Sequence, residues 1–262
     1  MTLLEARART GPMARINPVA KLGASALIAI PLILTLDMVS AAVALVLECA
    51  LLVFAGIGWR EFWTRTWPVW LAGPLTGVTI ALYGEPSGTV YLEWFLVRVS
   101  DGSLALAGAT ALRVLAIALP SVVLFITVDP TDLADGLAQV LHLPARFVLG
   151  ALAGLRMVGL FLDDWRALEL ARRARGVADR GRVRRFLGMA FALLVLSIRR
   201  GAKLSTAMEA RGFGATTKRS WARESRFGRR EWVLLAIGAL ISGVSIAAAV
   251  AFGTWNFILG PA

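Results

Sequence analysis

Long apolar segments, nearly free of charge, are the feature that most constrains the fold of this chain. The hydrocarbon core of a bilayer is about 30 Å thick and needs roughly 20 apolar residues of helix to cross it. Lipid offers no partner to an open backbone, so apolar segments of this length are expected to be helical. The sequence therefore predicts an all-α integral membrane protein with about five transmembrane helices. These cover residues 19–36, 38–58, 67–83, 104–128 and 232–252.

Two local features qualify this prediction. Asp37 alone separates the first two segments, which predicts a tight helical hairpin. The third segment contains Pro68 and Pro74 and is the weakest candidate, because proline removes a backbone donor that lipid cannot replace.

Charge is concentrated in one part of the chain. The sequence is 58% hydrophobic with a net charge of +11, and twenty of its 28 Lys and Arg residues lie between Arg146 and Arg230. Basic residues favour the cytoplasmic side of membrane proteins. The first 18 residues also lack the apolar core of a cleavable signal peptide. We therefore expect a cell-membrane protein with its N-terminus and basic segment in the cytoplasm and its C-terminus outside. With that orientation, the outer segments contain one basic residue, Arg98.

The chain is accordingly expected to have three parts: transmembrane helices over residues 1–128, a cytoplasmic segment over 129–230, and a last transmembrane helix over 231–262. The sequence of the middle part predicts about three helices, two of them long and amphipathic. A short helix begins at Asp129-Pro130, because Asp can cap it and Pro suits its first position. The long helices run from about Pro144 to Arg175 and from about Val183 to Arg211.

The apolar halves of the two long helices do not resemble ordinary spans. Residues 147–162 are interrupted by Arg156, and residues 186–198 number only 13. Each helix joins an apolar half to a basic half, which is typical of helices at a membrane surface. A pair of poor transmembrane helices remains the alternative.

The two long helices end alike, on Ala174-Arg175-Gly176 and on Ala210-Arg211-Gly212. Small residues allow another surface to approach the backbone, and Arg presents a planar fork of donors to carboxylates or carbonyls. A basic residue at a helix C-terminus is also favoured by the helix dipole, so a purely structural cap is the alternative. Two copies on neighbouring helices favour a docking function.

With these motifs the sequence resembles the transmembrane T component of energy-coupling factor (ECF) transporters, the EcfT or CbiQ-like family. The resemblance covers nearly the whole chain. Besides the two Ala-Arg-Gly motifs it is carried by Arg15-Ile16-Asn17-Pro18-Val19-Ala20-Lys21, Asp129-Pro130-Thr131-Asp132-Leu133, Leu143-Pro144 and the Ala-Leu-Ala-Gly-Leu-Arg run ending at Arg156.

The resemblance implies a non-enzymatic coupling subunit of an ABC-type importer for a vitamin or a transition-metal ion. Arg175 and Arg211 would each contact one of two ABC ATPase subunits. A separate membrane subunit, the S component, would bind the substrate. We expect the apolar residues of the long helices to contact it, namely Phe147, Leu152, Leu155, Phe161, Phe186, Phe191 and Leu194.

The absence of some motifs agrees with this assignment. The sequence has no G-x-x-x-x-G-K-[ST] loop for ATP. Its single histidine, His142, and single cysteine, Cys49, predict no metal site, cofactor or catalytic triad. Two alternatives stay open: a membrane enzyme that acts on lipid-linked phosphates with arginines as anion clamps, and a self-contained secondary transporter.

Other charged residues have simpler interpretations. Glu48 and Arg113 lie at compatible depths in the membrane and are expected to form a structural pair, or Glu48 to be neutral. Asp163, Asp164 and Glu169 are expected to pair with arginines of their own helix. The basic run over residues 218–230 precedes a membrane span and predicts binding to anionic lipid headgroups rather than to nucleic acid.

Overall fold

The computed structural model describes residues 12–54, 58–84, 87–94, 97–176, 181–214 and 220–255. The chain divides into two compact units, a membrane bundle formed by residues 8–136 and 225–262, and a second unit that contains residues 137–224. The elements in chain order are η1 (Pro12–Arg15), α1 (Pro18–Leu34), α2 (Met38–Phe54), α3 (Trp59–Tyr83), β1 (Val90–Trp94), β2 (Val97–Ser100), α4 (Asp101–Ile126), α5 (Pro130–Gln139), α6 (Ala145–Ala174), α7 (Arg182–Ala210) and α8 (Arg229–Ala251).

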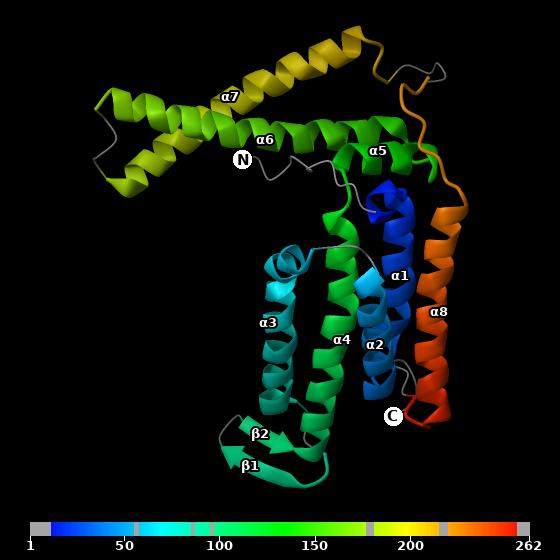
Figure 1. Ribbon diagram of the computed structural model, residues 1–262. Helices are drawn as coiled ribbons and strands as arrows, with labels where there is room; N and C mark the ends of the chain where they lie inside the picture. Colours follow the sequence, from blue (N-terminus) through cyan, green and yellow to red (C-terminus); the bar gives the residue numbers. More distant parts are fainter. Residues whose placement is uncertain are drawn as a thin grey trace. The chain divides into compact units, whose positions relative to one another are not determined.

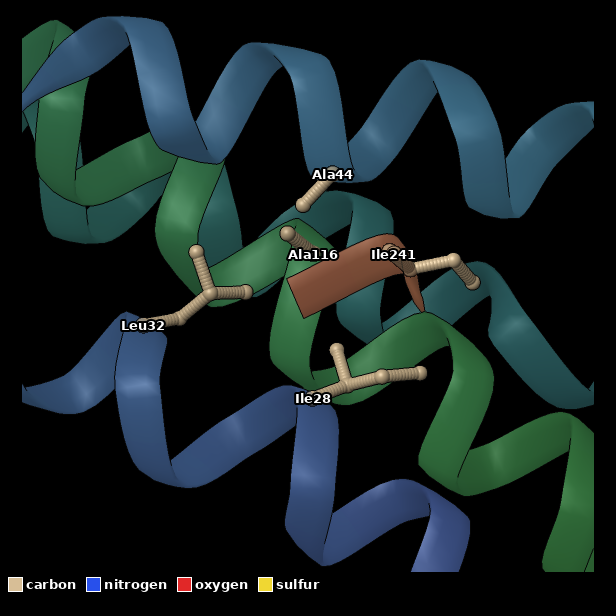
Figure 2. Packing of buried hydrophobic residues seen from close by; sticks show 5 residues of the cluster. All are labelled: Ile28, Leu32, Ala44, Ala116 and Ile241. Carbon is tan, nitrogen blue, oxygen red and sulfur yellow. The ribbon is translucent and has the colours of Figure 1, made fainter. Parts of the chain in front are cut away.

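The bundle is centred on α4, which packs against α1, α2 and α3, while α8 packs against α1 and α2 (Figure 1). Figure 2 shows side chains from four of these helices meeting in one buried cluster. Its small residues let the backbones approach closely, as is usual between helices in lipid. The cluster consists of Ile28 and Leu32 of α1, Ala44 of α2, Ala116 of α4 and Ile241 of α8.

The connection between α1 and α2 is as short as predicted, but the two helices do not form a packed hairpin. The Asp37 carboxylate accepts hydrogen bonds from the backbone N–H (2.7 Å) and the hydroxyl (2.8 Å) of Ser40 and so stabilises the start of α2. The two helices touch each other only slightly and pack instead against α4 and α8. The short connection could be predicted because its residues are adjacent in sequence. The helices that α1 and α2 pack against are set by the tertiary structure.

Helix α3 begins earlier than predicted and continues through Pro68 and Pro74. Its Gly73 and Gly77 lie against α4, where an added Cβ would come within 2.9 Å of Leu115 Cγ and 3.1 Å of Ala111 Cβ, respectively. After α3 the otherwise all-α fold contains one antiparallel hairpin, β1–β2.

Three of the described helices are long and apolar enough to cross a bilayer: α4, α6 and α8. Helices α1 and α2 are apolar but shorter, and α3 begins with charged residues. The presence of α6 in this group differs from the sequence expectation, because only Arg146 and Arg156 are charged between Ala145 and Leu162. A membrane protein is thus established, while the number of five spans stays a prediction.

The expected pairing of Glu48 with Arg113 is wrong. Both side chains are buried, but neither carboxylate oxygen of Glu48 and neither Nε nor Nη2 of Arg113 has a hydrogen-bond partner. Glu48 instead lines a small cavity of about 60 Å³ with apolar residues such as Ile28 and Val123. Similar depth in the membrane did not bring the two groups to the same face.

Candidate functional site

The C-terminal end of α6 carries the first Ala-Arg-Gly motif. The helix ends at Ala174, Arg175 is its C-cap, and Gly176 has a positive φ of 67°. The Gly176 N–H donates to the Arg173 carbonyl (3.0 Å). All three motif residues are exposed, and an ideal Cβ on Gly176 would meet nothing within 4 Å. The glycine is therefore required by its left-handed backbone, which ends the helix and leaves the Arg175 side chain at an open tip.

The C-terminal end of α7 repeats this geometry. The helix ends at Ala210, Arg211 is its C-cap, and Gly212 has a φ of 74° with no neighbour near its Cβ position. Gly212 N–H donates to the Glu209 carbonyl (2.9 Å), and Phe213 N–H donates to the Met208 carbonyl (2.9 Å). Both Ala-Arg-Gly motifs thus place an exposed arginine at the end of a helix that is stopped by a left-handed glycine.

Helices α6 and α7 pack across each other, and their C-terminal ends point in opposite directions (Figure 1). We call α6 and α7 the crossed pair. Asp164 of α6 accepts from Nη1 and Nη2 of Arg200 at 2.7 and 3.3 Å, a bidentate contact. Glu169 of α6 binds Arg185 of α7 as well as Arg173 of its own helix (2.9 Å).

These ion pairs confirm the expected pairing within α6 for Glu169, which binds Arg173, and correct it for Asp164, which instead binds Arg200 of α7. Only Asp163, 3.6 Å from Arg166, pairs solely within α6. The intrahelical spacing of charges is visible in sequence, but the partner helix is not. On α7 the buried Met189 lies between Arg185 and Arg200 in sequence. The arginines of the two interhelical pairs therefore lie on either side of this buried position along α7.

Two further contacts join the crossed pair. The rings of Trp165 and Phe186 lie 5.6 Å apart, and the Arg172 guanidinium lies close to Gly188, where an added Cβ would come within 3.1 Å of Nη2. Sequence reasoning missed Trp165, Arg185 and Arg200. No local signal identifies them, because their partners are 16–36 residues away in the chain.

Both helices of the crossed pair carry an exposed apolar stripe. On α7 it comprises Val183, Leu187, Phe191, Leu194 and Ile198. On α6 the residues Phe147, Leu155, Val158 and Leu162 follow the same helical spacing of three, four and eight residues. Such spacing places the side chains on one face of each helix.

The residues predicted to contact an S component are distributed unequally over these surfaces. Phe147, Leu155, Phe191 and Leu194 belong to the stripes. Phe186 is exposed but contacts Trp165. Leu152 and Phe161 are half-buried. The stripes also contain Val158, Leu162, Val183, Leu187 and Ile198, which were not among the predicted residues.

The entry motif around Asn17 has a structural role within the membrane bundle. Asn17 caps α1 by accepting from Val19 N–H (3.0 Å), while its amide donates to Ser225 Oγ (2.8 Å) and to the Arg226 carbonyl (3.1 Å). Its own N–H donates to Glu231 Oε1 (3.1 Å). The start of α1 is thereby fastened to the start of α8.

Lys21 makes a second polar contact at this end of the bundle. It is 1% exposed, and its ammonium donates to the carbonyl (3.2 Å) and hydroxyl (2.8 Å) of Thr127, the C-cap of α4. A cation at a helix C-terminus is favoured by the dipole. The C-terminal end of α4 and the N-terminal end of α8 are therefore both bonded to the start of α1.

Comparison with known proteins identifies the chain. The family described as cobalt transport protein, CbiQ, matches residues 10–221, which include both Ala-Arg-Gly motifs and the whole crossed pair. The chain belongs to the CbiQ family. It is a T component of an ECF transporter and a membrane transport protein, as the relatives below also indicate. Within the described residues, no group of three or more His, Cys, Asp and Glu side chains could hold a metal ion.

Members of the family from several bacteria resemble the chain over most of their length. The energy-coupling factor transporter transmembrane protein EcfT of Limosilactobacillus fermentum is 28% identical over 196 residues, 70% of this chain and 73% of the relative. The EcfT of Brevibacillus brevis is 25% identical over 201 residues, 72% and 73% of the two chains. That of Lacticaseibacillus paracasei is 28% identical over 190 residues, 67% and 70%.

Proposed function

We propose that this T component transmits the closure of two ABC ATPase subunits to a substrate-binding S component, for uptake of a vitamin or a transition-metal ion. One ATPase binds the end of α6 at residues 174–176, and the other binds the end of α7 at residues 210–212. The observation that carries the proposal is the repeated geometry of these two exposed ends.

The chemistry of each end suits insertion into a groove on a partner. Arg175 and Arg211 are exposed and offer planar donors that pair with carboxylates or carbonyls at two points. The backbone at Gly176 and Gly212 is open, so a partner surface can approach it. Two equivalent ends pointing in opposite directions suit two ATPases of similar shape (Figure 1).

The crossed pair provides the mechanical connection. The Asp164–Arg200 and Glu169–Arg185 contacts oppose rotation of one helix against the other. A displacement imposed at Arg175 by one ATPase is then transmitted to α7, and the reverse holds for Arg211. Movement of the ends thus becomes movement of the whole pair rather than bending of one helix.

The S component contacts the apolar stripes of the crossed pair. Five of the seven predicted contact residues are exposed, with Phe147 and Phe191 at 65% and 69%. An exposed apolar surface of this extent is typical of an interaction site. Because apolar packing is non-directional, such a surface can slide beneath a membrane partner without breaking specific bonds.

Relative to the membrane, the N-terminus and the crossed pair lie on the cytoplasmic side, and the C-terminus lies on the outer side. This orientation rests on the distribution of basic residues in the sequence. Single cysteines at Ser87 and at Ser220, in a Cys49→Ser background, should react with an impermeant reagent from opposite sides. Reaction of both from one side would contradict the orientation. Thr217, another position in the same inner segment, lies outside the described residues.

The decisive experiment measures co-purification of the ATPases with Arg175→Ala, Arg211→Ala and the double variant. Removing an anchoring arginine from an interface can cost 2 kcal/mol or more, roughly 30-fold in affinity. Each single change should weaken assembly, and the double change should abolish it. Lysine at both positions should restore assembly poorly, because it lacks the planar fork.

The matched control replaces two exposed basic residues of the same helices away from their ends, Arg166→Ala and Lys203→Ala. This variant removes the same charge and should retain the ATPases. Normal assembly of the Arg175/Arg211 double variant, or equal loss in the control, would show that the two ends are not the docking sites.

A further inference from the structure

Beside the first turns of α1 and α8 the membrane bundle has an open hollow of about 460 Å³. It is lined by Arg15, Ile16, Arg229, Arg230 and Val233. All three arginines are exposed, and none of them forms an ion pair with an acidic side chain in the described part of the chain. The hollow therefore gathers three positive charges without a direct ion pair, although Arg230 interacts electrostatically with its neighbour Glu231.

The framework of the bundle holds these like charges near one another. Glu231 accepts from Asn17 N–H through Oε1 (3.1 Å) and from Gly228 N–H through Oε2 (2.8 Å). Arg15 lies two residues before Asn17, and Arg229 follows Gly228. Because both oxygens of Glu231 accept backbone donors and Glu231 does not line the hollow, its charge serves the framework.

The position of Arg229 and Arg230 is unfavourable for the helix itself. They are the first two residues of α8, where the dipole disfavours positive charge. Helix stability thus gives no reason for these two arginines. A bound anion would, since guanidinium groups bind phosphate with two parallel hydrogen bonds.

An apolar surface continues from the hollow along α8. Val233 is 57% exposed, and Leu240 and Val244 follow on the same face seven and eleven residues later, 64% and 43% exposed. Trp232, 65% exposed, packs edge-on against Phe227 at this end of the helix. Helix α8 is long and apolar enough to span a bilayer. Tryptophan is enriched where such helices reach the membrane–water interface.

We propose that this hollow is a binding site for one anionic phospholipid, with its phosphate headgroup between Arg15, Arg229 and Arg230 and an acyl chain along Val233, Leu240 and Val244. Basic pockets between membrane helices suit such headgroups. The apolar continuation distinguishes a phospholipid from a free anion, which needs no such surface. A zwitterionic headgroup fits less well, because its amine would add a fourth positive charge.

The test uses the full chain in detergent, titrated with phosphatidylglycerol or phosphatidylcholine, with bound lipids counted by native mass spectrometry. The site variant is Arg15→Gln/Arg229→Gln/Arg230→Gln. The matched control, Arg60→Gln/Arg65→Gln/Arg199→Gln, removes the same charge from exposed positions elsewhere. Because Arg229 and Arg230 oppose the α8 dipole and Arg15 is exposed, the site variant should unfold at the same temperature as the wild type or higher.

We expect the wild type and the control to retain one phosphatidylglycerol in preference to phosphatidylcholine. The site variant should lose that preference by about a hundredfold, given the contribution of a basic residue near an anionic surface. Val233→Asp should weaken lipid retention while leaving the arginines in place. Millimolar inorganic phosphate should not displace the lipid.

Three results would overturn the proposal. Equal loss in the site and control variants would show a general attraction of charge. Unchanged retention in the site variant would show that the arginines do not bind the lipid. Displacement by inorganic phosphate, with no effect of Val233→Asp, would show a site for free anions instead.

Discussion

The membrane bundle and the crossed pair use apolar residues in different ways. In the bundle, side chains from α1, α2, α4 and α8 meet in a buried cluster, and Leu32 and Leu119 are almost fully covered. In the crossed pair, the described residues of α6 and α7 include only Val148 and Met189 as buried apolar side chains. The bundle covers its own apolar surface, whereas the crossed pair exposes it and is held by ion pairs at partly exposed positions.

This difference indicates where the chain depends on partners. Apolar surface that the bundle exposes faces lipid, which costs little. The apolar stripes of the crossed pair lie on helices with basic ends, so lipid alone does not suit the whole surface of these helices. Changes in the bundle should therefore alter folding of the chain alone, and changes in the crossed pair should alter assembly.

The largest effect is expected from Gly238→Leu in the bundle. A Cβ at this position would lie 3.1 Å from the Ala24 carbonyl oxygen and 3.3 Å from Ala24 Cα, so a larger side chain must separate α1 from α8. Overpacking against backbone costs about 1–3 kcal/mol or more. The thermal unfolding temperature should fall sharply, or the protein should aggregate. Gly243→Leu, on the same helix with open space around it, is the control and should unfold like the wild type.

A charge on the α7 stripe should affect a partner rather than the fold. Leu194→Glu places a carboxylate on an exposed apolar surface, so the isolated chain should remain stable. Burying the charge against an S component would cost several kcal/mol. A pull-down scored for both partners should keep the ATPases and lose the S component. Thr206→Glu, exposed on another face of α7, should keep both. Loss of the ATPases with retention of the S component would reverse the assignment.

A smaller effect is expected when the interhelical ion pairs are neutralised. Asp164→Asn/Glu169→Gln should widen the distribution of distances between spin labels at Leu170 and Thr206 in a Cys49→Ser background. Pairs this exposed contribute about 0.2–1 kcal/mol each, so the helices should stay folded. High salt should widen the wild-type distribution in the same direction. Asp163→Asn breaks only a contact within α6 and should change nothing; an unchanged double variant would show that the ion pairs do not set the crossing angle.

The smallest effect is expected from Glu48→Gln in the bundle. No hydrogen bond to either carboxylate oxygen exists to be lost, and a neutral side chain suits the apolar cavity. The unfolding temperature should stay constant or rise. Lys21→Met is the comparison, because it leaves the Thr127 carbonyl and hydroxyl without their donor and should cost about 1–3 kcal/mol. A large fall in the unfolding temperature of Glu48→Gln would show that the Glu48 carboxylate stabilises the folded bundle, contrary to this expectation.

Much of the local structure could be predicted because it depends on neighbours in sequence. Asp129 caps α5 by accepting from Thr131 N–H at 2.7 Å, and Pro130 is the first residue of that helix, as predicted. The long helices end within a residue of the predicted Arg175 and Arg211. The long apolar segments and the repeated motif also indicated a membrane transport protein of this family, which the comparisons confirm.

Side-chain partners far apart in sequence could not be predicted in the same way. Glu48 and Arg113 looked compatible by depth, but a helix presents its residues to several neighbours, and depth does not fix the direction in which a side chain points. Glu169 binds Arg173 of its own helix, as predicted, but it also binds Arg185 of α7, and Asp164 binds Arg200 of α7. The β1–β2 hairpin in the segment between α3 and α4 was likewise not anticipated.

Hydrophobic length, backbone preference and capping act within a few residues, so most helices, the Asp129 cap and the two glycine-terminated arginine motifs could be predicted from the sequence. The neighbours of each helix, the acids that join α6 to α7 and the shared hollow of Arg15, Arg229 and Arg230 became visible only in the folded structure. These depend on packing between segments up to about 200 residues apart, as in the bond from Asn17 to Glu231. Burial and geometry select such partners, and neither is set by local sequence.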